Sequence, residues 1–453
     1  MPSKGENERF IARALARHDI FKRFSNPTDH EFPEAALLLY FLRFVEDNAA
    51  SFDVSFAETE RLDAIGHAYG TAFFPITQLP SHVAKIAGRL GMDEKAFSDF
   101  SETLAPSAFK QAFAGFKWES GDLSLNRDEN IGKDLFFYIS NSLISPRKAT
   151  FVSGHELAPL ILKELVENHQ PLQEAPGETI ESVGAAATLS IYNPTCGDGD
   201  LLCLSVQHLT SYTLELSACD PNSMNVVIAS MRLLFLGYRG DYNRIRKGAT
   251  VPCVGIPDAV MTEFHLNREI NFDDFRNCMK LVSRGKFGFL FGEFDSNRNG
   301  DTAMLARIAI AKNKRCATHT ILLYAESSLT VLLPADSIIT DDIFLVQATR
   351  GDKERGVPTE DKFLPWLASV IAQQRDIPTL SAHVAREEIL AQENVSLDLA
   401  DYVDINGLSA PLVTTASLGD LAQRYKQATS AMQEADNAFA AALEQLSKTE
   451  AMP

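Results

Sequence analysis

A short glycine-containing turn between a strand and a helix constrains the fold of this chain more than any other stretch. Residues 185–191 form an apolar run short enough for a buried parallel strand, and residues 201–209 have the apolar spacing of a helix. Between them lie Gly197 and Gly199, and a missing side chain at such a turn lets a ligand approach the backbone. The stretch therefore predicts a strand–turn–helix unit.

The next predicted strand supports a ligand site at this turn. It covers residues 211–219 and ends in Asp220, 23 positions after Gly197. In nucleotide-binding sheets, a carboxylate at about this spacing hydrogen-bonds the ribose. The turn and the acid together favour a site for a nucleoside-type cofactor. The alternative is an ordinary doubly wound sheet with nothing bound.

Strand and helix patterns alternate regularly between residues 185 and 349. Alternating units of this kind specify a mostly parallel sheet with helices on both faces. The predicted class is α/β, with the seven-stranded, Rossmann-like layout of class I methyltransferases. The predicted strands are residues 185–191, 212–219, 243–247, 258–262, 286–291, 318–324 and 342–349.

Helical segments flank this predicted sheet and give three domains. Residues 1–125 are expected to form an N-terminal helical bundle, residues 126–410 a methyltransferase-like domain, and residues 411–453 a C-terminal coiled-coil helix. Apolar residues in the last segment recur at spacings of three and four, which is the seam of a coiled coil and predicts a partner helix. A terminal helix packed on its own domain is the alternative. The predicted partner-binding residues are Leu421, Tyr425, Met432, Phe439 and Leu446.

Charge and cysteine usage limit the partners and the compartment. The chain has 453 residues and a net charge of −18, whereas a protein that binds DNA alone usually carries a basic face. If it binds DNA, we expect a basic partner to help. No apolar run reaches the length of a membrane span. The six cysteines include no Cys-x-x-Cys pair, which indicates buried thiols in a reducing cytoplasm.

Several motifs match one known family in order and spacing. Residues 193–202 read Asn-Pro-Thr-Cys-Gly-Asp-Gly-Asp-Leu-Leu, where the family has Asp-Pro-Ala-Cys-Gly-Ser-Gly-Gly-Phe-Leu. Residues 37–47, 149–157, 220–238 and 387–403 are similar to further segments of it. On these motifs the chain resembles the modification subunit of type I restriction–modification systems, an N6-adenine DNA methyltransferase. The resemblance implies S-adenosylmethionine as cofactor, DNA as a partner, and a C-terminal helix that docks on a specificity-type subunit or a paralogous methyltransferase.

The catalytic loop of that family is changed in this chain. The family has Asn/Asp-Pro-Pro-Phe/Tyr after its fourth strand. Its first side chain and a neighbouring carbonyl accept the amine hydrogens of adenine, and its ring stacks on the flipped base. Here the loop reads Glu263, Phe264, His265 and Leu266, and no Asn-Pro-Pro or Asp-Pro-Pro-Tyr occurs anywhere in the chain. Displacing catalytic groups by about 1 Å lowers a reaction rate by orders of magnitude. We therefore predict that this site no longer catalyses methyl transfer. A rearranged site with Glu263 as acceptor or base is the alternative.

The cofactor side of the predicted site is altered as well. Asn193 lacks the charge of the family's Asp, and Asp198 and Asp200 replace small or neutral residues. After the third strand, Ala249 stands where the family has the Asp of Gly-Asp-Thr, so it cannot accept a hydrogen bond from the adenine amine of the cofactor. These changes leave open whether S-adenosylmethionine is still bound. The resemblance places the cofactor against Phe151, Asn193, Thr195, Gly197, Gly199 and Asp220.

No metal site is predicted. Residues 295–301 begin like a calcium loop, but the twelfth position is Ala306 and not Glu. His155-Glu156 lacks the second histidine of a zinc helix, and His265 is predicted to be a structural histidine.

The sequence therefore predicts a methyltransferase-fold pseudoenzyme, a noncatalytic subunit of a DNA modification, restriction or phage-defence complex. Two alternatives remain. One is an active S-adenosylmethionine-dependent adenine methyltransferase with the atypical loop at residues 263–266. The other is a decoy that inhibits a host methyltransferase complex.

Overall fold

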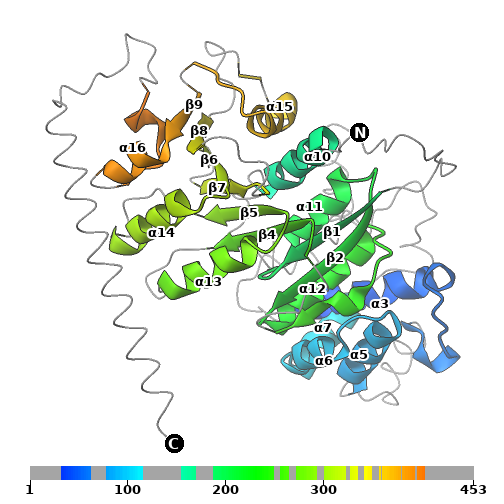
Figure 1. The fold of residues 1–453 in the computed structure, drawn as a ribbon. Coiled ribbons are helices and arrows are strands. Elements are labelled where there is room, and N and C mark those ends of the chain that lie inside the picture. The colour runs from blue at the N-terminus through cyan, green and yellow to red at the C-terminus, as the bar shows by residue number, and fades with distance from the viewer. Residues whose placement is uncertain are drawn as a thin grey trace, which may run out of the picture. The chain divides into compact units, whose positions relative to one another are not determined.

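The computed structural model describes residues 32–62, 78–115, 155–169, 187–248, 256–264, 272–292, 300–322, 327–334, 341–348, 357–358, 360–378, 380–392 and 395–403 (Figure 1). The predicted coiled-coil helix with its partner-binding residues lies outside this part, as do Phe151, His265, Leu266 and the calcium-like loop at residues 295–299. The chain divides into two compact units, Met1–Glu263 with Leu281–Phe289 and Phe264–Lys280 with Leu290–Pro453.

The N-terminal part of the first unit is helical. Residues 35–42 of its first helix are all buried, so this helix is apolar all round, as a core helix must be. Phe44 of the same helix stacks on Phe235, with ring centroids 4.0 Å apart. The elements are α3 (Phe32–Asp47), η1 (Ala49–Phe52), η2 (Glu58–Glu60), α5 (Leu79–Arg89), α6 (Glu94–Glu102) and α7 (Pro106–Gly115).

Parallel strands follow in the first unit. Strand β1 pairs with β2 on one side and β4 on the other, so that Ile191 lies opposite both Leu216 and Ala259. Strand β3 pairs in parallel with β2. The elements are α10 (Leu157–His169), β1 (Thr188–Asn193), α11 (Asp200–His208), β2 (Thr213–Asp220), α12 (Ser223–Phe235), η5 (Tyr242–Arg244), β3 (Ile245–Lys247) and β4 (Ala259–Phe264).

The second unit has a mixed arrangement. Strand β6 is antiparallel to β7 and parallel to β8, and β8 is antiparallel to β9. The remaining elements, of which α13 and β5 belong partly to the first unit, are α13 (Phe272–Val282), β5 (Phe287–Gly292), α14 (Gly300–Lys312), β6 (Cys316–Leu322), β7 (Ser327–Leu332), β8 (Asp342–Ala348), α15 (Glu360–Ala372), β9 (Ser381–Ala385), α16 (Arg386–Ala391) and η8 (Leu399–Asp401).

The hydrogen-bonded strand order is β3-β2-β1-β4-β5-β7-β6-β8-β9. The α/β class is confirmed, and each of the seven predicted strands corresponds to an observed one. The predicted number of strands is wrong, because the described residues alone form a sheet of nine. Strand β7 pairs antiparallel with β6 and begins only five positions after β6 ends, so an expectation of strand–helix–strand units misses it. Strand β9 has only five residues, too few for its alternation to stand out.

No helix in the described ranges is long and apolar enough to cross a membrane. The five cysteines in those ranges, Cys196, Cys203, Cys219, Cys278 and Cys316, are buried as thiols.

Candidate cofactor and catalytic site

The predicted strand–turn–helix unit is present at residues 188–208. Strand β1 ends at the buried Asn193, whose Oδ1 accepts a hydrogen bond from the Thr195 amide at 3.1 Å. Gly197 and Gly199 have φ values of 52° and 86°, in the left-handed region that glycine adopts most easily. Helix α11 then begins at Asp200. The glycines are therefore needed for the backbone path of the turn.

Gly199 also lies against helix α12. A Cβ added at Gly199 would stand 2.7 Å from the Cβ of Ala229 and 2.9 Å from its Cα. Real Cβ atoms essentially never approach this closely, so only glycine fits. The space that a side chain at position 199 would need is thus occupied by Ala229.

Asp220 is the last residue of β2, as the sequence predicted, and its carboxylate accepts hydrogen bonds from the protein. Oδ2 accepts from the Gly197 amide at 3.0 Å. Oδ1 accepts from the Asn222 amide at 2.8 Å and from Nδ2 of Asn225 at 3.1 Å. Asp220 is 6% exposed, and it joins the glycine turn to the start of α12.

Asp198 and Asp200 pair with an arginine that the sequence analysis missed. Nη1 of Arg232, from α12, lies 3.3 Å from Oδ2 of Asp198 and also contacts Oδ1 of Asp200. It donates to the Asp198 carbonyl at 3.2 Å as well. The three side chains are 5%, 4% and 11% exposed, so this is a buried ion triad. The available signal was an arginine within an otherwise apolar helix, residues 226–235.

The thiols of Cys196 and Cys203, which lie at the turn and at the start of α11, are unreactive. Burial raises the pKa of Cys196 well above its ordinary value, with a further contribution from Asp220. Burial also raises the pKa of Cys203 to about 12. Because only the thiolate is a strong nucleophile, neither residue can act as one near neutral pH.

The end of β4 is tied to the turn and to His155. Oγ1 of Thr195 lies 2.6 Å from Oγ1 of Thr262 and 3.4 Å from the Glu263 carbonyl, to which it donates. Oε2 of Glu263 lies 3.5 Å from Nε2 of His155, just before α10. The two side chains are 15% and 3% exposed. The sequence analysis treated His155 and Glu263 separately, and the structure brings them together.

Phe264 is the last residue of β4, so the strand continues into the predicted catalytic loop. Its ring packs edge-on against Phe275, with centroids 5.3 Å apart. Within the described residues, no cluster of three or more His, Cys, Asp or Glu side chains could hold a metal ion.

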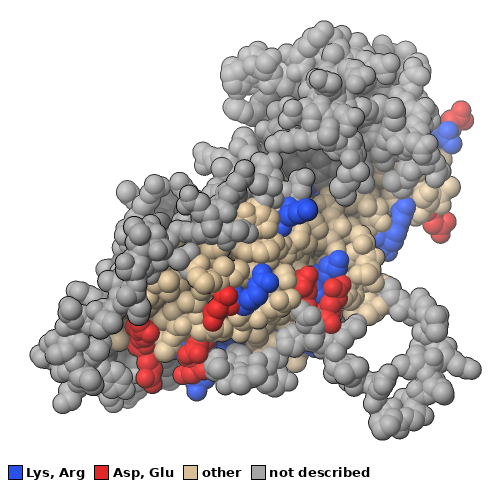
Figure 2. Space-filling view, turned by 90° about the horizontal axis from the view of Figure 1, so that it is seen from above, with Lys and Arg blue, Asp and Glu red and all other residues tan. Residues whose placement is uncertain are grey.

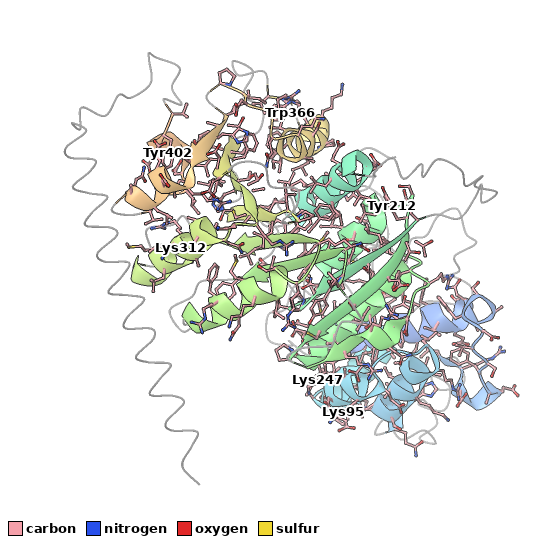
Figure 3. The ribbon with its side chains drawn as sticks, viewed as in Figure 1. Lys95, Tyr212, Lys247, Lys312, Trp366 and Tyr402 are labelled. Carbon is pink, nitrogen blue, oxygen red and sulfur yellow. The ribbon has the colours of Figure 1, made fainter. Side chains whose placement is uncertain are left out.

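The end of β3 is held by helix α6. The Lys247 amide donates to Oδ2 of Asp93 at 2.8 Å, and Lys247 Nζ donates to Oδ2 of Asp99 at 2.7 Å. The Gly248 amide donates to the Asp220 carbonyl at 2.9 Å. Figure 3 labels Lys247 beside Lys95 of α6. Helix α6 and its N-cap residue Asp93 are thus bonded directly to the last residue of β3, and the Gly248 amide links this point to the end of β2.

Described charged side chains of both signs are interspersed on the face shown in Figure 2. The described side chains of this face therefore form no continuous basic patch of the kind that grips DNA phosphates.

No protein-family model matches the sequence, and a comparison with curated proteins found no match. Solved structures do match. One is the methyltransferase subunit of a type I restriction–modification system from Streptococcus thermophilus, at 10% identity, with 88% of this chain and 100% of that chain covered and a TM-score of 0.59. This chain has the fold of a type I modification subunit.

A second solved structure agrees. It is a modification subunit of a putative type I restriction enzyme from Vibrio vulnificus YJ016, at 11% identity, with 87% of this chain and 96% of that chain covered and a TM-score of 0.50. The resemblance predicted from the motifs is confirmed at the level of the fold. Both matches cover almost the whole of each subunit, so the likeness extends well beyond a shared strand–turn–helix unit.

Proposed function

We propose that this chain is a noncatalytic subunit of a cytoplasmic DNA modification, restriction or phage-defence complex, in which a methyltransferase fold serves for binding. The near full-length match to type I modification subunits supports the class of complex. The contacts of Glu263 at the end of β4 support the loss of catalysis.

One observation carries this proposal. Methylation of adenine needs two acceptors for the amine hydrogens, preorganised beside the flipped base. In this chain the side chain of Glu263 pairs with His155, and its carbonyl accepts a hydrogen bond from Thr195. One oxygen of the Glu263 carboxylate and one acceptor site of its carbonyl are therefore already engaged within the chain. The backbone there is a strand, not a loop stiffened by two prolines.

Partners complete the proposed complex. The net charge of −18 disfavours DNA binding by the chain alone, so a basic partner supplies much of the phosphate contact. The heptad seam at residues 418–446 provides a surface for the helix of a specificity-type subunit or a paralogous methyltransferase.

The test is a methyl-transfer assay. The purified chain, alone and with the products of neighbouring genes, is incubated with labelled S-adenosylmethionine and DNA. Glu263→Ala is compared with Glu215→Ala, which changes an exposed glutamate of strand β2. We expect no transfer by the chain alone, and any transfer by a complex should be equal for both variants. Transfer by the chain alone that Glu263→Ala abolishes and Glu215→Ala preserves would overturn the proposal.

The active enzyme is the second candidate. It is favoured by the pairing of Glu263 with His155, since a carboxylate beside an imidazole is a common general-base arrangement. The same assay decides between the two. A decoy inhibitor would instead lower the methylation of host DNA when the chain is overexpressed.

A further inference from the structure

We propose that the turn between β1 and α11 is closed by the chain's own side chains and does not take up S-adenosylmethionine. The inference deepens the proposed function and rests on it for the identity of the cofactor. Three sets of contacts support this inference, one at each part of the expected cofactor site.

The first set is at Asp220, the acid expected to hold the ribose. A carboxylate offers about four lone-pair sites, and three of those on Asp220 already accept hydrogen bonds from Gly197, Asn222 and Asn225. The carboxylate can therefore accept from at most one of the two ribose hydroxyls. Only 6% of the residue is exposed.

The second set is the Asp198–Arg232–Asp200 triad. The two acids could have attracted the positively charged sulfonium of the cofactor. They turn inward instead, onto the guanidinium of Arg232, and are almost completely buried. The chain thus supplies its own cation, and a cofactor would have to displace Arg232 to gain from these carboxylates.

The third set fills the space around the turn. Ala229 occupies the volume beside Gly199 that a bare glycine would otherwise leave open. At the end of β3, where the family resemblance implies a contact with the adenine of the cofactor, Lys247 is bonded to Asp93, the N-cap residue of α6, and to Asp99 within α6. The residues present do not fit the cofactor.

The cost of displacing these contacts decides the outcome. Each buried hydrogen bond that binding leaves unmade weakens affinity by about 5- to 150-fold. Two such losses near the middle of this range, about 30-fold each, move a micromolar site to about 1 mM, and any further loss weakens it beyond that. We therefore expect half-saturation above about 1 mM, the upper end of ordinary substrate constants.

The experiment is equilibrium dialysis of the full chain, without partners, against labelled S-adenosylmethionine. Asp220→Asn is measured beside the unchanged chain, and thermal unfolding is followed with and without about 1 mM cofactor. We expect no saturable uptake below about 1 mM, the same result for Asp220→Asn, and no shift in Tm.

Saturable uptake below about 1 mM that Asp220→Asn weakens would overturn the inference. The methyl-transfer assay separates this failure from that of the proposed function. Uptake of S-adenosylmethionine without methyl transfer would overturn only the inference that the turn is closed. Methyl transfer by the chain alone would overturn the proposed noncatalytic role as well.

Discussion

Arg232 is the residue on which the charge balance of the glycine turn depends. It faces two buried carboxylates, and removing one partner of a buried ion network leaves charge without compensation. We expect Arg232→Met to lower the free energy of unfolding by about 3–5 kcal/mol. The measurement is chemical denaturation.

The control is Arg244→Met, because Arg244 is 40% exposed and pairs with the exposed Glu215 and Asp241. It should cost about 1 kcal/mol or less. Adding Asp198→Asn and Asp200→Asn to Arg232→Met should restore part of the loss. Equal effects of the two single variants would show that the triad contributes nothing special.

Gly199 offers a second prediction at this scale. Gly199→Ala places a Cβ against the backbone of Ala229 and forces a left-handed φ on alanine, so we expect a loss of about 2–5 kcal/mol. Gly237→Ala is the matched control. It has a φ of 81° and nothing within 4 Å of its added Cβ, so only the conformational cost of about 1–2 kcal/mol applies. Thermal unfolding of both variants gives the difference, and a Gly199→Ala that is no worse than its control contradicts the close approach.

The same residues show what the sequence can predict about the site. The positions of Gly197, Gly199 and Asp220 follow from local patterns of strand, turn and helix. Arg232 and His155 could not be found in that way, because their partners lie on other elements and no local periodicity links them. The roles of the predicted residues also depend on neighbours. Asp220 is where the pattern places it, yet its carboxylate bonds to the turn itself.

At the scale of elements, Glu60 joins the short helix η2 to α5. It accepts hydrogen bonds from Arg89 at 2.9 and 3.0 Å, from the Ala57 amide at 3.1 Å and from Lys85 at 3.2 Å. The Arg89 guanidinium first, and then the Ala57 amide and Lys85, lower the pKa of Glu60 from 4.5 to about 2. Its folded pKa is therefore below its unfolded one, and the linked stability is present above pH 4.5 and is lost as the pH falls toward 2.

We expect Glu60→Gln to reduce the free energy of unfolding at pH 7 by about 1 kcal/mol, since the pair is close to solvent. The difference from the unchanged chain should shrink below pH 4.5 and vanish near pH 2. Denaturant titrations across this range measure it. Glu58→Gln, at an exposed position of the same short helix, serves as the control. A difference that does not depend on pH would argue against the ionised network.

Elements differ in how well the sequence reveals them. Strand β5 is buried at all six positions, and such a continuous apolar run is easy to recognise. The hairpin of β6 and β7 is hidden, because it interrupts the alternation of strands and helices on which the seven-stranded expectation depended. Length and burial alone did not decide which strands were found, because the three-residue β3 was predicted and the six-residue β7 was missed. The place of a strand in the alternation with helices decided it.

At the scale of the whole molecule, the net charge and the heptad pattern of the sequence both favour the partner that we propose. An acidic chain cannot gain much from the release of phosphate counterions, and a seam with apolar residues at every third or fourth position is stable only when covered. One basic partner helix would meet both needs. The seam should therefore control both assembly and DNA binding.

We expect Leu421→Asp with Phe439→Asp to abolish co-purification with the partner, because two carboxylates would be buried in the seam. Ser430→Asp adds the same charge at an f position, on the face opposite the seam, and should leave the complex intact. Co-purification reports assembly, and DNA binding at two salt concentrations reports the phosphate contacts. The seam variant should bind DNA as weakly as the isolated chain. A seam variant that still assembles would mean that the C-terminal helix packs on its own domain, and the partner would then have to bind another surface.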